Sequence, residues 1–278
     1  MAPGALYLDR MMFTQRRLTY ESDTLDAFRG ILARWPIITF WGVPVIPVGS
    51  QLDSCLGLAL GCLWVGRRKK GIRRVGFPTW SWASVIGVIY NDRYATNSVC
   101  RHYLQGHPEI LAQNDAYLQF WKFSEGQQMP LREIIQQLKS QAVPEDSHFL
   151  VVEGDLVRVK LDPAGRDFHH CEQDDKELGF IGSAYLDLES PSTPSKSNIS
   201  LTSHTADPEG SSSVEDALIL IAWCDLQETS ERRMVMMLLT WVTNDVAERK
   251  GLLYSHVDAA AAESYRAIPR TRKKFLLQ

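Results

Sequence analysis

The chain has 278 residues, 45% hydrophobic and 23% charged, a balance typical of a globular protein that excludes a fibrous or wholly disordered one. The length suits one large domain or two small ones. A formal net charge of −3 excludes a generally basic surface, so a site for nucleic acid would have to be local.

The N-terminal part is expected to combine helices with short extended segments. Between residues 22 and 36, apolar side chains recur at spacings of three and four, which predicts a helix. Ser22 or Asp23 is predicted to cap its start, and Pro36 to end it. The segment "IITFWGVPVIP" is rich in β-branched and aromatic residues but contains two prolines, which favours a short strand or an extended packed loop.

A second apolar segment, Leu52 to Val65, has leucines at helical spacing and is predicted to be helical despite its glycines. Its apolar run is shorter than the roughly 20 residues that a bilayer requires. The first 17 residues lack the apolar core and cleavage site of a secretory signal. We therefore expect an intracellular protein, cytoplasmic or alternatively nuclear, with no membrane contact.

The segment "FPTWSWAS", Phe77 to Ser84, places two tryptophans one residue apart. If it is a strand that continues into "VIGVIY", alternation puts Trp80 and Trp82 on one bulky face and smaller side chains on the other. This pattern favours a buried packing element over a ligand-stacking platform, and the indole N–H groups would then need partners. The motif consists of Pro78, Trp80, Ser81, Trp82 and Ala83.

The C-terminal part changes to strand patterns. "PLREIIQQLKSQ" predicts one more helix that starts near Pro130, and "LVRVKL", residues 156–161, then alternates between apolar and charged side chains as a half-buried strand does. "FIGSAYLDL", "ALILIAW" and "MVMMLLTWV" are further strand candidates. The predicted fold class is α+β, with N-terminal helices packed on a mainly antiparallel sheet in a single region, 1–278; residues 1–90 hold the helices and the WSWAS strand, and residues 91–278 are β-rich.

Two segments interrupt this pattern. Residues 189–216 are dominated by Ser, Thr, Pro and charge, and they predict a disordered insertion because they hold too little apolar surface to offset ordering entropy. "AAAAESYRAI" predicts a short helix that Asp258 caps and Pro269 ends.

A basic run lies just before the tryptophan motif. A solvated turn is the favoured interpretation; the alternative is a nuclear or nucleic-acid-binding module that also uses Arg270 to Lys274. The run lacks the interleaved aromatic residues of a single-strand groove. This candidate basic surface consists of Arg67, Arg68, Lys69, Lys70, Arg73 and Arg74.

No cofactor, metal or small-molecule ligand is predicted, and we expect no catalytic residue. Cys55 and Cys62 lie in apolar surroundings, which makes thiols inert. Two clusters hold ligands that zinc accepts but lack the paired spacings of a structural site, so exposed polar loops are favoured over a metal-dependent enzyme. These clusters are Cys100, His102 and His107, and then His169, His170, Cys171, Asp174 and Asp175. The densest group of carboxylates, Asp174, Asp175 and Glu177, is explained by a solvated acidic turn.

Three segments together resemble the region that follows the conserved domain of fungal heterokaryon incompatibility (HET) proteins. Residues 18–32 resemble the family's helix after an aromatic-Thr-x-Arg segment, residues 41–44 its Trp-Gly-hydrophobic-Pro segment, and residues 78–83 its Pro-Ser-Trp-Ser-Trp-Ala segment. Thr79 stands where the family usually has serine. "GFIGSAYLDL" and the closing segment resemble its late elements, so the resemblance covers most of the chain outside residues 189–216.

The resemblance implies a fungal, non-enzymatic protein that acts in non-self recognition or cell-death control through protein contacts. The HET domain itself lies N-terminal to this region in the family, and we expect it to be absent here. The implied partners are HET-family proteins or that missing domain. No catalytic residue is carried over from the family.

Overall fold

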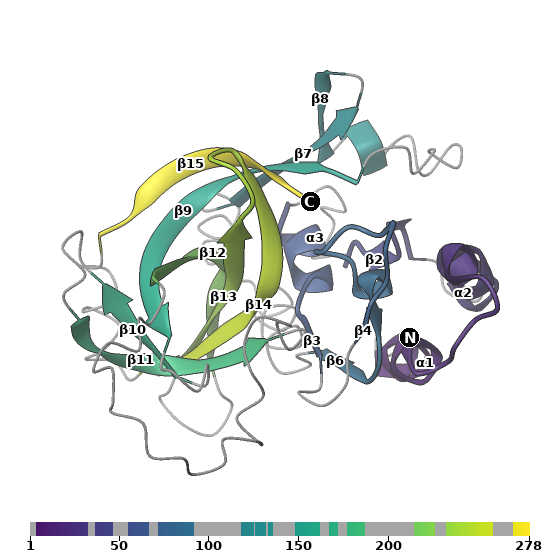
Figure 1. Cartoon of the computed structure of the whole chain (residues 1–278), viewed down its shortest axis with the longest axis horizontal. Helices are drawn as coiled ribbons and strands as arrows, with labels where there is room; N and C mark the ends of the chain where they lie inside the picture. The colour runs from purple at the N-terminus through teal and green to yellow at the C-terminus, as the bar shows by residue number, and fades with distance from the viewer. Residues whose placement is uncertain are drawn as a thin grey trace, which may run out of the picture.

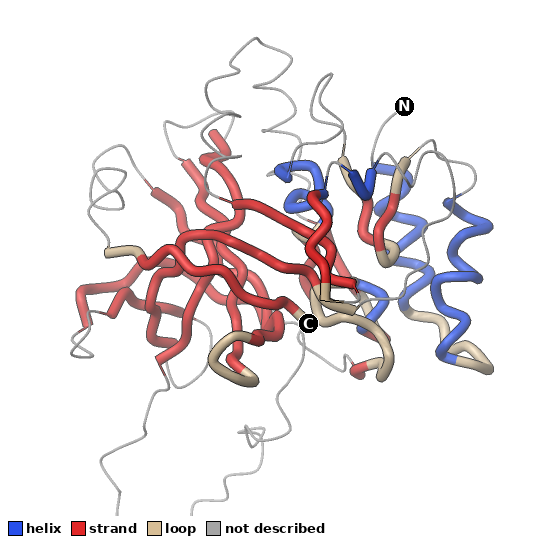
Figure 2. Tube along the Cα trace, turned by 90° about the horizontal axis from the view of Figure 1, so that it is seen from above, coloured by secondary structure: helices blue, strands red, loops and turns tan. Residues whose placement is uncertain are grey.

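The computed structural model describes residues 4–32, 37–46, 55–66, 72–91, 118–124, 126–131, 133–135, 148–161, 167–171, 177–186, 214–225, 232–257 and 269–278. The fold is α+β, with few helices and a mainly antiparallel sheet, as the sequence predicts. The helices gather at one end of the molecule and the long strands at the other (Figures 1 and 2).

Short elements make up the N-terminal half. Its helices are α1 (Gly4–Thr14), α2 (Thr24–Leu32) and α3 (Cys55–Gly61), with 3-10 turns η1 (Glu21–Asp23) and η2 (Trp82–Ser84). Its strands are β1 (Thr39–Phe40), β2 (Val43–Pro44), β3 (Trp64–Gly66), β4 (Ile72–Arg73), β5 (Val85–Ile86) and β6 (Ile89–Asn91). They pair antiparallel as β1–β2, β3–β6 and β4–β5.

The predicted helices are confirmed where they are described. In α2, Leu25 and Phe28 are buried, whereas Ser22 and Asp23 lie in η1 before the helix. The segment predicted as extended forms the β1–β2 hairpin, and the helix predicted over 52–65 is shorter, ending at Gly61 before β3 begins. Pro36 lies outside the described residues.

Helix α3 lies against β2 at a distance that only glycine permits. A Cβ atom at Gly57 or Gly61 would come closer than 3.0 Å to the carbonyl oxygen of Ile46 or Pro44, respectively. The Ile46 N–H also donates to the Gly57 carbonyl at 3.0 Å. The two glycines therefore hold helix and hairpin together through main-chain contact.

Alanine at Gly61 is expected to lower the free energy of unfolding by about 1–3 kcal/mol, because the opposing atom is backbone and yields little. Gly30 in α2 is the matched control: nothing lies within 4 Å of a Cβ added there. Gly30→Ala should raise stability by about 0.5–1 kcal/mol through helix propensity. Urea unfolding measures the stability of both variants. Equal losses of stability would contradict the close approach of α3 to the hairpin.

Nine strands form the sheet of the C-terminal half. They are β7 (Leu118–Ser124), β8 (Gln127–Pro130), β9 (Leu150–Leu161), β10 (Asp167–Cys171), β11 (Glu177–Leu186), β12 (Val214–Asp225), β13 (Arg232–Trp241), β14 (Val246–Val257) and β15 (Thr271–Leu277). Their order is β10-β11-β14-β13-β12-β9-β7-β8, and β10 also pairs with β9, so six strands close a circuit. Figure 1 shows these strands curving around a common axis.

Strand β15 lies off this circuit and bridges two of its strands, β9 and β14. It pairs antiparallel with β9 over its whole length and parallel with β14 at Val246 and Ala247. Every other pairing in the sheet is antiparallel.

The strands predicted for the C-terminal part are confirmed, and β9 shows the predicted alternation in its second half. The helix predicted after Pro130 is confirmed only in part: Pro130 ends β8, and the backbone is helical at 131 and 133–135, where Leu131, Ile134 and Ile135 are buried. The predicted insertion lies outside the described residues except for Val214 to Asp216, which begin β12. The helix predicted after Asp258 also lies outside them.

One hydrophobic core runs through both halves. It joins Phe28 and Trp82 of the helical half to Val235 and Met237 of the sheet. Both faces of β13 are buried over Met234 to Leu239, which explains its continuous apolar sequence. None of the helices in the described ranges is long and apolar enough to span a bilayer.

Candidate functional site

The tryptophan motif lies where the helical half meets the sheet, but it is not a strand. The strand prediction is wrong for Trp80 to Ser84: Trp82–Ser84 is the 3-10 turn η2, and β5 begins only at Val85. Serine side chains explain the difference. Ser81 Oγ accepts from the Ala83 N–H at 3.1 Å, and Ser84 Oγ donates to the Ser81 carbonyl at 2.7 Å. Such local bonds compete with a strand ladder.

Both tryptophans are fully buried, so their predicted role as packing residues is confirmed. Trp80 stacks on Phe40 with ring centroids 5.6 Å apart, whereas Trp82 packs edge-on to Phe28 at 4.7 Å and to Phe13. Each indole N–H has a main-chain partner: Trp80 donates to the His148 carbonyl at 3.3 Å, and Trp82 to that of Gly42 at 2.6 Å. The two side chains thus anchor different parts of the chain.

The motif also holds the tight turn of the β1–β2 hairpin. Trp41 and Gly42 have φ values of 51° and 75°, the left-handed pair of a two-residue hairpin loop. A bulky residue is rarely found there, because its Cβ crowds the backbone. Ser81 Oγ donates to the Trp41 carbonyl at 2.6 Å, and a Cβ at Gly42 would lie 3.1 Å from Trp82. The segments 41–44 and 78–83 are therefore in direct contact.

Thr79 connects the motif to the last two strands. Its N–H and its hydroxyl both donate to the carbonyl oxygen of Gln278, the N–H at 2.9 Å, and its hydroxyl oxygen accepts the Arg249 N–H at 2.9 Å. The Gln278 N–H in turn donates to the Ala247 carbonyl at 2.9 Å. A hydroxyl at this position therefore links the motif to β14 and to the end of β15.

Arg249 is a buried charge that sequence reasoning did not single out. Its side chain donates to the carbonyl oxygens of Cys62, at 2.5 Å, and Trp64, and its guanidinium lies 3.8 Å from the centroid of the Trp64 ring. The Trp64 indole donates in turn to the Trp80 carbonyl at 3.1 Å. Arg249 therefore joins β14 to the segment that links α3 and β3.

Burial raises the pKa of the Cys62 thiol from its ordinary 9.0 to about 12, although the positive charges of Arg249 and Arg10 lower it in part. The prediction that Cys62 is inert therefore has a physical basis. Cys55 is half-buried.

Alkylation at mildly alkaline pH should modify Cys62 only as fast as the chain unfolds, and Cys55 faster; peptide mapping by mass spectrometry separates the two. Because the folded chain keeps the Cys62 proton and the unfolded chain loses it, the contribution of this thiol to stability should fall as pH rises from about 9 towards about 12. Cys62 labelling as fast as that of Cys55 in the folded chain would contradict its burial.

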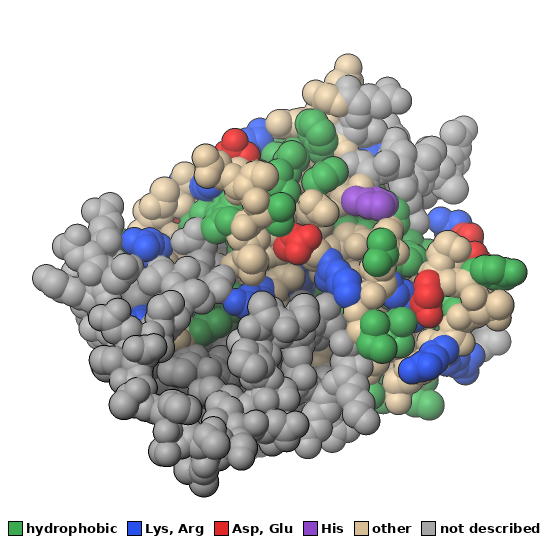
Figure 3. Space-filling view, viewed as in Figure 1, with side chains coloured by type: hydrophobic (Ala, Val, Ile, Leu, Met, Phe, Trp, Pro, Cys, Tyr) green, Lys and Arg blue, Asp and Glu red, His purple; other side chains and the backbone are tan. Residues whose placement is uncertain are grey.

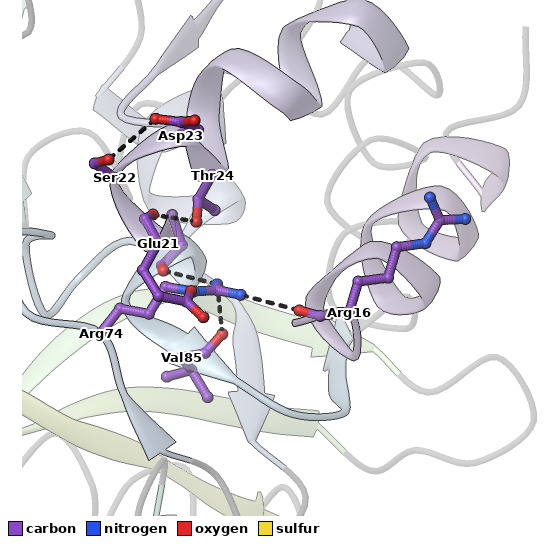
Figure 4. A network of polar contacts seen from close by, with 8 residues as sticks. Arg16, Glu21, Ser22, Asp23, Thr24, Arg74 and Val85 are labelled. Carbon is purple, nitrogen blue, oxygen red and sulfur yellow. Dashed lines mark hydrogen bonds and ion pairs between the residues drawn. The ribbon is translucent and has the colours of Figure 1, made fainter. Parts of the chain in front are cut away.

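The last residue of the basic run is buried, so its assignment to a basic surface is wrong. Arg74 pairs with the Glu21 carboxylate and donates to the carbonyls of Ala83 and Val85, each at 3.1 Å (Figure 4). Arg73 is half-buried and donates to Ser84 Oγ at 3.3 Å. Residues 67–70 lie outside the described residues. Arg73 and Arg74 thus form hydrogen bonds to the tryptophan segment itself, at Ser84 and Ala83.

The second basic segment, Arg270 to Lys274, overlaps the start of strand β15. Arg272 pairs with Glu153 at 2.9 Å and with Asp155 at 3.3 Å, while Lys273 and Lys274 lie over the rings of Trp241 and Trp121 at 3.8 and 4.2 Å. These cations thus have partners within the fold.

The two clusters of potential metal ligands, for which the sequence favours exposed polar loops, fall largely outside the described residues. His169, His170 and Cys171 lie on strand β10, so the loop prediction is wrong for them, and Glu177 begins β11. Cys100, His102, His107, Asp174 and Asp175 are not described. No group of three side chains able to hold a metal ion occurs among the residues that are described.

Comparisons with protein-family models, with curated proteins and with solved structures each found no match. The site is therefore interpreted from its own geometry: a buried segment in which Thr79, Trp80, Ser81 and Trp82 bind main-chain groups of distant segments. Such an arrangement stabilises a fold.

Proposed function

We propose that the chain is a non-enzymatic protein that acts through protein contacts in non-self recognition or in the control of cell death. The resemblance of three segments to fungal HET proteins motivates the role. One observation supports a structural role for these segments: Trp80 and Trp82 each have 0% accessible surface. Because the side chains of this motif are buried in the core, recognition of another protein would have to use other, exposed residues.

The buried cations support the same proposal. Arg74 and Arg249 donate to main-chain carbonyls of the motif and its neighbours. Charges committed to carbonyls in this way fix the position of segments rather than activate a reacting group.

Co-expression with a full-length HET-domain protein in fungal cells tests the proposal. The expected result is physical association of the two proteins, measured by co-precipitation from both sides, together with a change in the frequency of cell death. A control strain expresses the HET-domain protein alone at matched abundance. If the chain neither associates nor alters cell death, the proposed function is wrong.

A further inference from the structure

Thr19 lies in an exposed connection between α1 and η1. Residues 15–20 form neither helix nor strand, and Arg16, Arg17 and Thr19 are exposed. Tyr20, the next residue along the chain, is 67% exposed and has an extended backbone with φ −122° and ψ 115°. A second protein can therefore reach the Thr19 hydroxyl together with the side chains on either side of it.

The main chain of this connection is anchored, although its polar side chains are exposed. The Arg16 N–H donates to the Phe13 carbonyl at 2.9 Å, and the Asp23 N–H donates to the Tyr20 carbonyl at 3.1 Å. Between these bonds, the partly buried Leu18 packs against the hydrophobic core. The connection therefore has a defined position at the surface of the folded chain.

Two arginines precede Thr19 by three and two residues, in the order Arg-Arg-Leu-Thr. The Arg16 side chain extends away from the buried Arg74 network (Figure 4). In the space-filling view, basic and acidic side chains are exposed on the helical half of the molecule (Figure 3). Guanidinium groups pair with carboxylates in a bidentate geometry, so an acidic groove can recognise two such arginines together. The threonine hydroxyl then follows that contact by a fixed number of residues.

We propose that Thr19 is a phosphorylation site for a serine/threonine protein kinase whose acidic substrate groove binds Arg16 and Arg17. The co-substrate is ATP with Mg²⁺, held by the kinase. The Thr19 hydroxyl oxygen bonds to the γ-phosphorus of ATP, the bond from that phosphorus to the β–γ bridging oxygen breaks, and ADP leaves. The hydroxyl proton passes to the catalytic aspartate of the kinase. This site is independent of whether the chain associates with a HET-domain protein.

Phosphorylation makes an electrically balanced segment acidic. Residues 16–23 hold two arginines and two carboxylates, whose charges cancel. A phosphothreonine adds a charge of about −1.5 to −2 at pH 7. The phosphate is attached two residues before Glu21, whose carboxylate pairs with the buried Arg74. Because both partners of that ion pair remain, the modified chain should keep its fold and differ in surface charge.

Phosphorylation of the folded full chain tests the inference. The probe is the catalytic subunit of cyclic-AMP-dependent protein kinase, which prefers arginines at these two positions, with ATP and Mg²⁺. Fragmentation mass spectrometry should locate phosphate on Thr19, and Thr19→Val should abolish phosphorylation of this segment. Replacing Arg16 and Arg17 together by alanine should lower kcat/KM for Thr19 at least about tenfold, because both ion pairs with the groove are lost.

Arg29→Ala is the matched control, since the Arg29 side chain is 57% exposed on α2 but lies outside the recognised segment. This variant should be phosphorylated at the wild-type rate. Thermal unfolding must show that the variants remain folded. The pair Arg16→Lys and Arg17→Lys keeps the positive charges and should be phosphorylated faster than the alanine pair.

Four results would overturn the inference. One is phosphate on Tyr20 or Ser22 in place of Thr19, and another is an unchanged kcat/KM after both arginines are replaced by alanine. A third is phosphorylation of a synthetic peptide of residues 13–24 but not of the folded chain, because the connection would then be inaccessible. The last is an unmodified Thr19 in chain isolated from eukaryotic cells in which an arginine-directed kinase is active.

Discussion

Replacing Trp82 by alanine is expected to lower the free energy of unfolding by about 3–5 kcal/mol, as removal of a fully buried aromatic side chain does. The variant loses the edge-on contacts with Phe28 and Phe13 and leaves the Gly42 carbonyl without its indole donor. Because that carbonyl belongs to the hairpin turn, the β1–β2 hairpin should loosen with the core. Urea unfolding followed by circular dichroism measures the loss.

Two further variants make this result interpretable. Tyr90→Ala removes an aromatic that is 41% exposed and should change stability by less than about 0.5 kcal/mol. Trp82→Phe keeps a ring but removes the N–H group, and should cost about 1–3 kcal/mol even if the alanine variant does not fold. An unchanged melting temperature in folded Trp82→Ala would indicate a solvent-facing tryptophan and favour a ligand platform.

The second large effect is expected at Arg249. Arg249→Met should destabilise the fold by about 3–5 kcal/mol, since it removes both side-chain bonds to main-chain carbonyls and leaves buried acceptors unsatisfied. The carbonyls of Cys62 and Trp64 lose their donors, and Trp64 loses the guanidinium over its ring. Chemical denaturation of the purified variant measures the change.

Arg29→Met is the matched control, because the Arg29 side chain is 57% exposed and its ion pair with Asp26 lies on the surface. Surface pairs contribute about 0–1 kcal/mol, so a change within that range is expected. Similar losses of stability in Arg29→Met and Arg249→Met would contradict the conclusion that Arg249 joins β14 to the segment between α3 and β3.

Regular periodicity made much of the fold predictable. The spacing of Leu25 and Phe28 reflects α2, and the alternation from Leu156 to Leu161 reflects one strand of an antiparallel sheet. The pairing order of the sheet was not predictable, because it joins segments far apart in sequence, such as β9 with β15.

One prediction failed where local hydrogen bonds determine the backbone conformation. The alternating motif from Trp80 to Ala83 fits a strand, but bonds from Ser81 and Ser84 to nearby main chain favour the turn. Helix α1 was not predicted: the first 17 residues lack the pattern of a secretory signal, and no helix was inferred from them. The predicted insertion extended three residues too far, because Glu215 and Asp216 are charged although they belong to the start of β12.

The site residues whose roles were not predicted are two buried arginines and one buried threonine. Charge alone suggested a solvated turn for Arg74, and only its tertiary partner Glu21 and the carbonyls of β5 and η2 explain its burial. Arg249 carried a usable signal: it shares the buried face of β14 with Ala247, two residues before it. Thr79 gave none, because its partners lie 170 and 199 residues away.

Native-state hydrogen exchange tests most directly whether the motif is a buried element that unites the two halves. The amides to follow are those of Thr79, bonded to Gln278, and Arg249, bonded to Thr79, with the core strand β13 as the reference. We predict that all of them exchange with the free energy of global unfolding. Exchange of the Thr79 amide with a much smaller free energy than β13 would contradict this account.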